Sequence, residues 1–223
     1  MGVKDKIIEL KTTLSENCTL VAVSKTKPSR LIHEAYASGH RDFGENKVQE
    51  LVEKYEELPK DIRWHMIGHL QRNKVKYLAS FVHLVHGIDS LKLLKEVNKQ
   101  AANNHRIINC LLQIHIADEA TKFGLNTDEL DDLLSSDEFA QLSNIKIVGL
   151  MGMATNTQNR PQVVSEFEAL KALFDKLQKG SFSSNVDLTH LSMGMSGDYP
   201  LALKAGSNMI RVGSKIFGER NYS

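Results

Sequence analysis

The chain has 223 residues, which allows one large domain or two small ones. It carries 28 Lys and Arg against 27 Asp and Glu, and the formal net charge of +1 argues against a nucleic-acid-binding protein, which usually shows a basic excess. Hydrophobic residues make up 41% and charged residues 25%, a globular composition that excludes intrinsically disordered and collagen-like proteins.

The first predicted element is an amphipathic helix over residues 2–15. This segment contains acidic residues and no long apolar stretch, so it does not resemble a signal peptide. Position 6 is Lys, where N-myristoylation requires Ser or Thr. Nowhere does the chain approach the roughly 20 consecutive apolar residues that a membrane span needs. We therefore expect a cytoplasmic protein without a membrane or nucleic-acid partner.

Two cysteines, Cys18 and Cys110, lie far apart in apolar stretches and lack the spacing of metal ligands. The number and positions of these cysteines predict buried free thiols in a reducing compartment.

Eight short apolar segments alternate with longer segments of helical periodicity. The predicted strands are Leu20–Val23, Asp42–Gly44 (the weakest), Arg63–Ile67, Val82–Val85, Ile107–Ile116, Ile145–Leu150, Leu188–Leu191 and Met209–Val212. The clearest helical stripe is Phe167, Leu170, Leu173, Phe174 and Leu177. Strands that alternate with helices predict a parallel sheet and an α/β fold. Eight such units favour a (β/α)8 TIM-type barrel with an extra N-terminal helix, and a doubly wound open sheet is the alternative. Because no linker-like stretch interrupts the pattern, we expect residues 1–223 to form one domain.

Barrel geometry places active sites at the carboxyl ends of the strands, so the residues after each strand are the candidates. Lys25 follows the first strand, on the same face as Val21 and Val23. A lysine that points into a barrel is costly unless it is paired or neutral, and a neutral amine can form a Schiff base. The alternative is an ordinary strand-end lysine that reaches solvent.

The second and third strands are followed by further polar residues. Glu45 and Asn46 either cap the next helix, or Asn46 faces a ligand. His65 and His69 are four residues apart, but Gly68 interrupts any helix there and no third ligand is near, so we do not predict a zinc site. After the fifth strand, Lys122 is either a second amine at the barrel mouth or a solvated loop lysine.

The last two loops carry the strongest phosphate signal. Ser196 follows the seventh strand, and Gly213 and Ser214 follow the eighth, with Arg211 inside that strand. Loops after strands seven and eight of such barrels frequently bind phosphate through backbone N–H groups and hydroxyls. Plain turns are the alternative. A phosphate-anchored carbonyl compound in Schiff-base linkage would join Lys25 to this cradle, and both pyridoxal 5′-phosphate and an aldolase-type sugar phosphate fit that description.

Five motifs then make the chain resemble a known family over essentially its whole length. They are AVSKTKP at 22–28, FGENKVQE at 43–50, WHMIGHLQRNK at 64–74, LSMGMSGD at 191–198 and IRVGSKIFG at 210–218. In this order they resemble the pyridoxal phosphate homeostasis proteins, single-domain barrels related to the N-terminal domain of alanine racemase.

The resemblance implies pyridoxal phosphate as cofactor and a role for each motif. Lys25 corresponds to the family's Schiff-base lysine, and Asn46 to a polar neighbour of the ring. Arg211 corresponds to an arginine near the ring nitrogen or the phosphate. The phosphate-contacting positions correspond to Ser196, Gly213 and Ser214, with Ser214 standing where the family often carries Thr or another small residue.

Two functions follow from the resemblance. The first is a binding protein without enzymatic activity, which holds pyridoxal phosphate and hands it to apo-enzymes, as a monomer or weak dimer. The alternative is an amino-acid racemase, which needs a base on each face of the ring. In alanine racemase the second base comes from an additional domain, for which we expect no room here. Lys47, Lys122 and Lys215 remain candidates for a secondary cofactor site.

Overall fold

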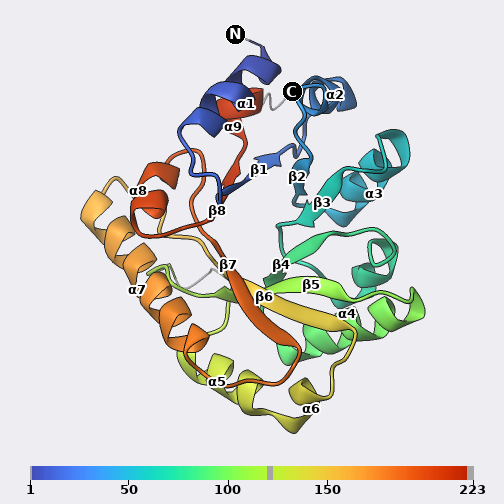
Figure 1. The fold of residues 1–223 in the computed structure, drawn as a ribbon, viewed down its shortest axis with the longest axis vertical. Coiled ribbons are helices and arrows are strands. Elements are labelled where there is room, and N and C mark those ends of the chain that lie inside the picture. Colours follow the sequence, from blue (N-terminus) through green and yellow to red (C-terminus); the bar gives the residue numbers. More distant parts are fainter. Residues whose placement is uncertain (1, 120–122, 220–223) are drawn as a thin grey trace.

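Eight parallel strands close into a barrel in the computed structural model, which describes residues 2–119 and 123–219 (Figure 1). Each strand pairs with its neighbour in the chain, and the last pairs with the first through Val21 and Arg211. The strands are β1 (Thr19–Val23), β2 (Asp42–Glu45), β3 (Arg63–Met66), β4 (Leu84–Ile88), β5 (Ile108–Ile114), β6 (Ile145–Gly152), β7 (Val186–Ser192) and β8 (Met209–Val212). The (β/α)8 prediction is confirmed, and the doubly wound alternative is wrong.

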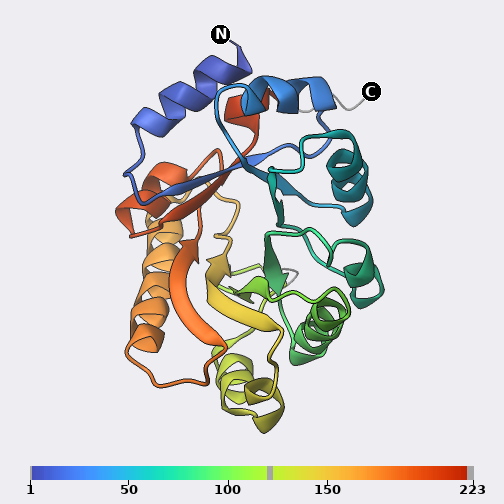
Figure 2. The same ribbon diagram turned by 45° about the vertical axis from the view of Figure 1, so that its right-hand side comes forward.

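Helices surround the barrel on its outer face in both ribbon views (Figures 1 and 2). They are α1 (Val3–Thr12), α2 (Ser29–Tyr36), α3 (Val48–Glu57), α4 (Leu91–Asn103), α5 (Thr127–Ser135), α6 (Asp137–Ala140), α7 (Arg160–Gln178), α8 (Tyr199–Lys204) and α9 (Ser214–Phe217). The connection between β3 and β4 contains a 3-10 helix, η1 (Arg72–Tyr77). In the described part of the chain, no helix has the length and apolar character required to cross a membrane.

Helix α1 covers the barrel beside α9, the last helix of the described residues. It packs against α2 and α9, and both views place it next to them (Figures 1 and 2). Its buried residues Val3, Ile7 and Leu10 belong to the main hydrophobic core. Because α9 spans only four residues, α1 supplies the apolar cover that a full eighth helix gives in other barrels.

The strand predictions differ from the structure mainly at β4. That strand begins at Leu84 and continues through Ile88, whereas Val82–Val85 was predicted. Val82 belongs to the preceding turn, where its N–H donates to the carbonyl of Leu78. The strand continues past His86 and Gly87, which interrupt the apolar pattern on which the prediction rested.

Two layers of apolar side chains lie on opposite sides of the sheet. The larger core fills the space between strands and helices. A second cluster, centred on Val21, Leu84 and Met209, is formed by residues that face the barrel interior. Of the two free cysteines, Cys110 is buried as predicted, whereas Cys18 is only half-buried.

Candidate functional site

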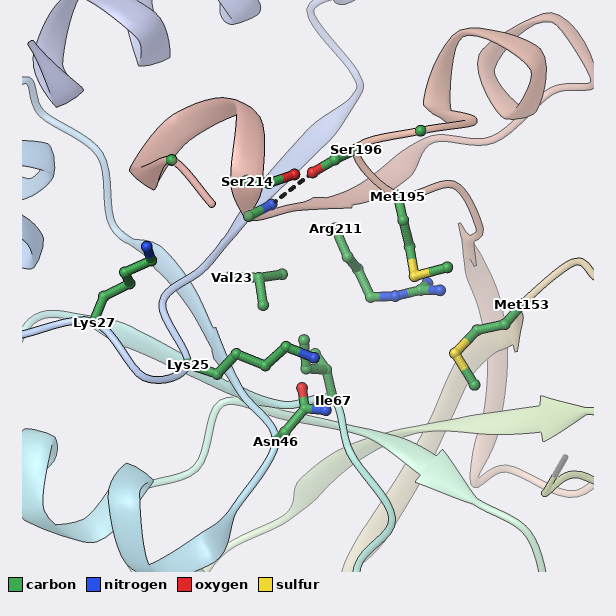
Figure 3. Close-up of a pocket in the computed structure, with 13 residues that line it drawn as sticks. Val23, Lys25, Lys27, Asn46, Ile67, Met153, Met195, Ser196, Arg211 and Ser214 are labelled. Atoms are coloured by element: carbon green, nitrogen blue, oxygen red, sulfur yellow. Dashed lines mark hydrogen bonds between the residues drawn. The ribbon is translucent and has the colours of Figure 1, made fainter. Parts of the chain in front are cut away.

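A cavity of about 280 Å³ opens at the carboxyl end of the barrel (Figure 3). Loops after several strands line it, since parallel strands bring their carboxyl ends together. All six residues predicted from the sequence lie on its walls: Lys25, Asn46, Ser196, Arg211, Gly213 and Ser214. Apolar side chains of Val23, Ile67, Met153 and Met195 complete the described lining, together with Lys27, Gly197 and Gly218.

Lys25 points into this cavity from the end of β1. Val21 faces the barrel interior and Val23 lines the cavity, so the alternation of the strand directs Lys25 to the same side. Figure 3 shows its ammonium end beside Ile67 and Asn46, in the space that Arg211 approaches from the opposite side. The side chain therefore lies within the barrel mouth, as one of the two sequence interpretations required.

The turn that presents Lys25 is strained and held by helix α3. Thr26 has a φ of 63°, a left-handed conformation that is unusual for a β-branched residue. Its N–H donates to Glu50 Oε1 at 2.5 Å, and Lys54 Nζ donates to the carbonyl of Ser24 at 2.8 Å. Two side chains of α3 thus fix the backbone on both sides of Lys25.

A buried carboxyl group lies beneath this turn. Glu45, the last residue of β2, is fully buried, and its Oε1 accepts hydrogen bonds from Ser24 Oγ at 2.6 Å and Lys54 Nζ at 2.7 Å. Burial raises the pKa of Glu45 to about 7, although the Lys54 ammonium acts in the opposite direction. The capping interpretation of Glu45 and Asn46 is wrong, because the N-cap of α3 is Lys47.

The loops after β7 and β8 are tied together at the cavity wall. The Gly213 N–H donates to Ser196 Oγ at 3.1 Å, the dashed line in Figure 3. Gly213 also lies against β1, since a Cβ at this position would approach the Val23 carbonyl oxygen to 3.1 Å. Ser214 begins α9, where the first N–H groups of a helix have no preceding carbonyl to accept them. Hydroxyls and amides here can bind a small anion.

Arg211 forms the floor of the cavity and is 4% exposed. Its Nη1 donates to the carbonyl of Ser192 at 2.9 Å and to Ser192 Oγ at 2.6 Å, and its Nη2 donates to the carbonyl of Gly152 at 3.1 Å. Burial lowers the pKa of Arg211 to about 10, so the guanidinium remains a cation at neutral pH. Among the described residues that line the cavity, none is acidic.

Of the candidates for a secondary site, Lys47 and Lys215 do not line this cavity. Lys27 lines the cavity, but its ammonium donates to the carbonyl of Glu219 at 2.7 Å. Lys47 occupies the N-cap position of α3 without a side-chain capping hydrogen bond, and Lys215 lies over the Tyr199 ring, 4.8 Å from its centroid. Lys122 lies outside the described residues. A secondary cofactor site on one of these lysines therefore stays a prediction.

The two histidines that suggested zinc lie in different environments. His65 is buried in the barrel, whereas His69 is well exposed and pairs with Asp89 at 3.3 Å. In the described part of the chain, Asp42, His65 and His83 place ligand atoms within 4.8 Å of one another. Arg63 already donates to both carboxylate oxygens of Asp42, so we assign no metal ion to this group.

Sequence reasoning missed the polar residues inside the barrel. His86 and Ser192 are fully buried, and each directly contacts Arg211 or another buried polar group. Each is a polar residue at a strand position surrounded by apolar residues. That signal marks the inward face of a strand, but it does not identify the partner across the barrel.

Comparisons with known proteins find relatives over nearly the whole chain. The family model for the alanine racemase N-terminal domain matches residues 3–221. The chain is 41% identical over 209 residues to the pyridoxal phosphate homeostasis protein of Aquifex aeolicus, covering 93% of this chain and 90% of that protein. It is 38% identical over 228 residues to the protein of the same name from Escherichia coli K12, covering 99% and 95%.

Solved structures show the same barrel. PipY of Synechococcus elongatus with pyridoxal phosphate bound superposes with a TM-score of 0.87 at 34% identity, covering 97% of this chain and 100% of that chain. Alanine racemase from Bartonella henselae, with covalently bound pyridoxal phosphate, has a TM-score of 0.71 at 13% identity and shares the fold alone. The match covers 98% of this chain but 60% of the racemase.

Proposed function

Because the chain belongs to the pyridoxal phosphate homeostasis protein family, we propose that its cavity binds pyridoxal 5′-phosphate and that Lys25 holds it as a Schiff base. Residues 1–223 would act as one binding domain, which stores the cofactor and releases it to apo-enzymes. The observation that carries the proposal is the convergence of an amine, an anion cradle and a buried guanidinium on one cavity.

The position of Lys25 in the cavity supports covalent attachment. Its amine, when neutral, adds to the aldehyde carbon, a C=N bond forms, and the carbonyl oxygen leaves as water. The strained turn and its contacts with Glu50 and Lys54 keep the nucleophile in the cavity rather than in solvent. Asn46 lies on the same wall and would contact the ring (Figure 3).

The phosphate would occupy the loops after β7 and β8. Ser196 and Ser214 offer hydroxyls, and Gly213 brings the backbone close to the cavity without a side chain. Small residues that expose N–H groups are the common means of binding phosphate in this type of barrel.

Arg211 supports a role in holding the cofactor rather than in catalysing a reaction that needs a strong electron sink. Bound pyridoxal phosphate is a strong electron sink when its ring nitrogen is protonated, which a neighbouring carboxylate favours. A cationic guanidinium beside the ring nitrogen, in place of a carboxylate, favours the unprotonated nitrogen. The described cavity lining supplies Arg211 and no carboxylate, which supports a binding protein over the racemase alternative.

Borohydride reduction followed by peptide mass spectrometry tests the attachment. The protein loaded with pyridoxal phosphate should be yellow, and the reduced adduct should lie on Lys25. Lys25→Ala should lose the colour while keeping the fold. Lys27→Ala, which changes the other lysine of the cavity lining, should keep it. An adduct on a different residue would refute the site.

Transfer of the cofactor tests the homeostasis role. The loaded protein is mixed with an apo-aminotransferase, and recovery of activity is compared with that given by free pyridoxal phosphate at the same concentration. We expect the bound cofactor to reach the apo-enzyme. Failure to transfer, with the Lys25 adduct confirmed, would leave a binding protein that is not a donor.

A further inference from the structure

A chain of buried polar side chains crosses the barrel interior beneath the cavity. His65 Nε2 lies 3.1 Å from Asp42 Oδ1, and His65 Nδ1 lies 3.0 Å from His86 Nε2. His86 Nδ1 lies 3.3 Å from Ser192 Oγ, which in turn lies 2.6 Å from Arg211 Nη1. All five residues are at most 9% exposed. They come from β2, β3, β4, β7 and β8, so the chain links opposite sides of the barrel.

The chemistry of its two ends gives this chain a direction. Arg211 can only donate, so Ser192 Oγ accepts from it, and the Ser192 hydroxyl hydrogen is then available to donate to Nδ1 of a neutral His86. His86 then carries its proton on Nε2 and donates to His65 Nδ1. His65 likewise carries its proton on Nε2 and donates to the Asp42 carboxylate, which can only accept. Every hydrogen bond therefore points from the cation to the anion.

The surroundings support a neutral His86 and a fixed anionic end at Asp42. Burial lowers the pKa of His86 well below its ordinary value, and the Arg211 guanidinium acts in the same direction. Burial alone would raise the pKa of Asp42, but hydrogen bonds from Arg63 and His65 together hold it well below its usual range. Asp42 is the first residue of β2, at the end of the barrel opposite the cavity.

We propose that Ser192, His86, His65 and Asp42 form a polarised relay of positioning residues that holds the Arg211 guanidinium in one orientation toward the bound cofactor. The relay rests on the proposed function for its ligand, but its hydrogen-bond order does not. Aligned hydrogen bonds strengthen one another in a buried environment, so a change at Asp42 should reach Arg211 across the barrel.

The order of the hydrogen bonds is tested without cofactor. Two-bond proton–nitrogen NMR correlations of the histidine-labelled protein at pH 8 report which ring nitrogen carries the proton, with His65→Gln and His86→Gln used to assign the signals. We expect the Nε2–H tautomer for both histidines. A charged ring, or the Nδ1–H tautomer in either residue, would overturn the relay.

The positioning role is tested with pyridoxal phosphate by its dissociation constant and by the absorption maximum of the bound form. Ser192→Ala removes a hydrogen bond to Arg211 and should weaken binding about tenfold. Asp42→Asn keeps the shape of the far end of the relay but removes its charge. It should shift the absorption maximum of the bound form in the same direction as Ser192→Ala does, and it should weaken binding about threefold. His83→Gln is the matched control, because its ring lies 5.4 Å from that of His65 but outside the relay.

The outcomes separate this proposal from the proposed function. If Ser192→Ala alone changes the spectrum and Asp42→Asn behaves like His83→Gln, the relay is refuted while the cofactor site stands. If the unaltered protein binds no pyridoxal phosphate, the proposed function fails and the tautomers alone decide the relay. Should Asp42→Asn not fold, His65→Gln interrupts the same relay and replaces it in the comparison.

Discussion

At the scale of single residues, the charged groups below the Lys25 turn couple the site to the core. Lys54 is 6% exposed, yet its ammonium reaches Glu45, Glu50 and the carbonyl of Ser24. A buried ammonium needs such partners, because an unpaired one would be strongly destabilising. The same contacts fix the backbone of the turn, so a core ion pair also determines where Lys25 lies.

Glu45→Gln should change how stability depends on pH. Burial raises the pKa of Glu45 to about 7, above its ordinary value of 4.5, so between these pH values the folded protein binds a proton that the unfolded chain has lost. The contribution of this group to the free energy of unfolding is therefore fully present below pH 4.5 and is lost as the pH rises to 7. The stability of the unaltered protein, minus that of the variant, should fall by about 2 kcal/mol from about pH 5 to about pH 7 in urea denaturation.

Glu53→Gln is the matched control, since Glu53 is exposed on the same helix. The difference in free energy of unfolding between the unaltered protein and Glu53→Gln should stay constant over this pH range. A flat curve for Glu45→Gln as well would mean that the carboxyl group is not titrating as burial requires.

At the residue scale, a local pattern can suggest the direction of a side chain but not its partners. Alternation put Lys25 on the face of Val21 and Val23 as one of two interpretations, and the family resemblance favoured it. His86 was missed, because its neighbours Val85 and Gly87 gave no sign that its partner would be His65 on the adjacent strand. A hydrogen bond between side chains of neighbouring strands depends on the register of those strands, which a local sequence pattern does not contain.

At the scale of elements, α1 is part of the barrel core rather than an appendage. Ile7 is fully buried, while the adjacent Ile8 is 48% exposed. Ile7→Ala should lower the free energy of unfolding by about 3 kcal/mol, because it leaves a cavity between α1 and the core. Ile8→Ala should change it by less than about 0.5 kcal/mol. Chemical denaturation of both variants measures the difference, and equal effects would mean that α1 does not pack as described.

Strands β6 and β7 approach so closely that one position must be glycine. A Cβ on Gly149 would lie 1.8 Å from the carbonyl oxygen of His190. Gly149→Ala should therefore force the strands apart and cost at least about 3 kcal/mol of stability in a thermal or urea unfolding experiment. Gly197→Ala is the control, because a Cβ added there would have no heavy atom within 4 Å apart from its chain neighbours. A tolerated Gly149→Ala would contradict the pairing of β6 with β7.

Element boundaries were predictable where apolar residues are uninterrupted. The predicted Leu20–Val23 differs from β1 only by the omission of Thr19, whereas β4 was placed too early because His86 and Gly87 break its apolar pattern. Helices α5 and α6 were not singled out, since few apolar side chains stand among their acidic residues. Tertiary packing against the barrel, rather than periodicity, stabilises such segments.

At the scale of the whole molecule, a balanced net charge coexists with a cationic site. The formal charge is +1, but the described cavity lining carries Lys25, Lys27 and Arg211 without an acidic residue. The compensating carboxylates lie outside the cavity, at Asp42, Glu45 and Glu50. This separation gives an anion-binding mouth on a molecule with no overall basic character.

The side chains that line the described cavity predict that alanine is not racemised. Racemisation requires a proton donor and acceptor on each face of the cofactor ring. Lys25 can serve one face, but Met153 and Met195 line the cavity near Arg211 and cannot transfer protons (Figure 3). Incubation of the loaded protein with L-alanine in D2O should exchange the α-proton no faster than free pyridoxal phosphate at the same concentration, as followed by NMR. Faster exchange that Lys25→Ala abolishes would instead establish the racemase activity, with Lys27 as the first residue to examine for the second base.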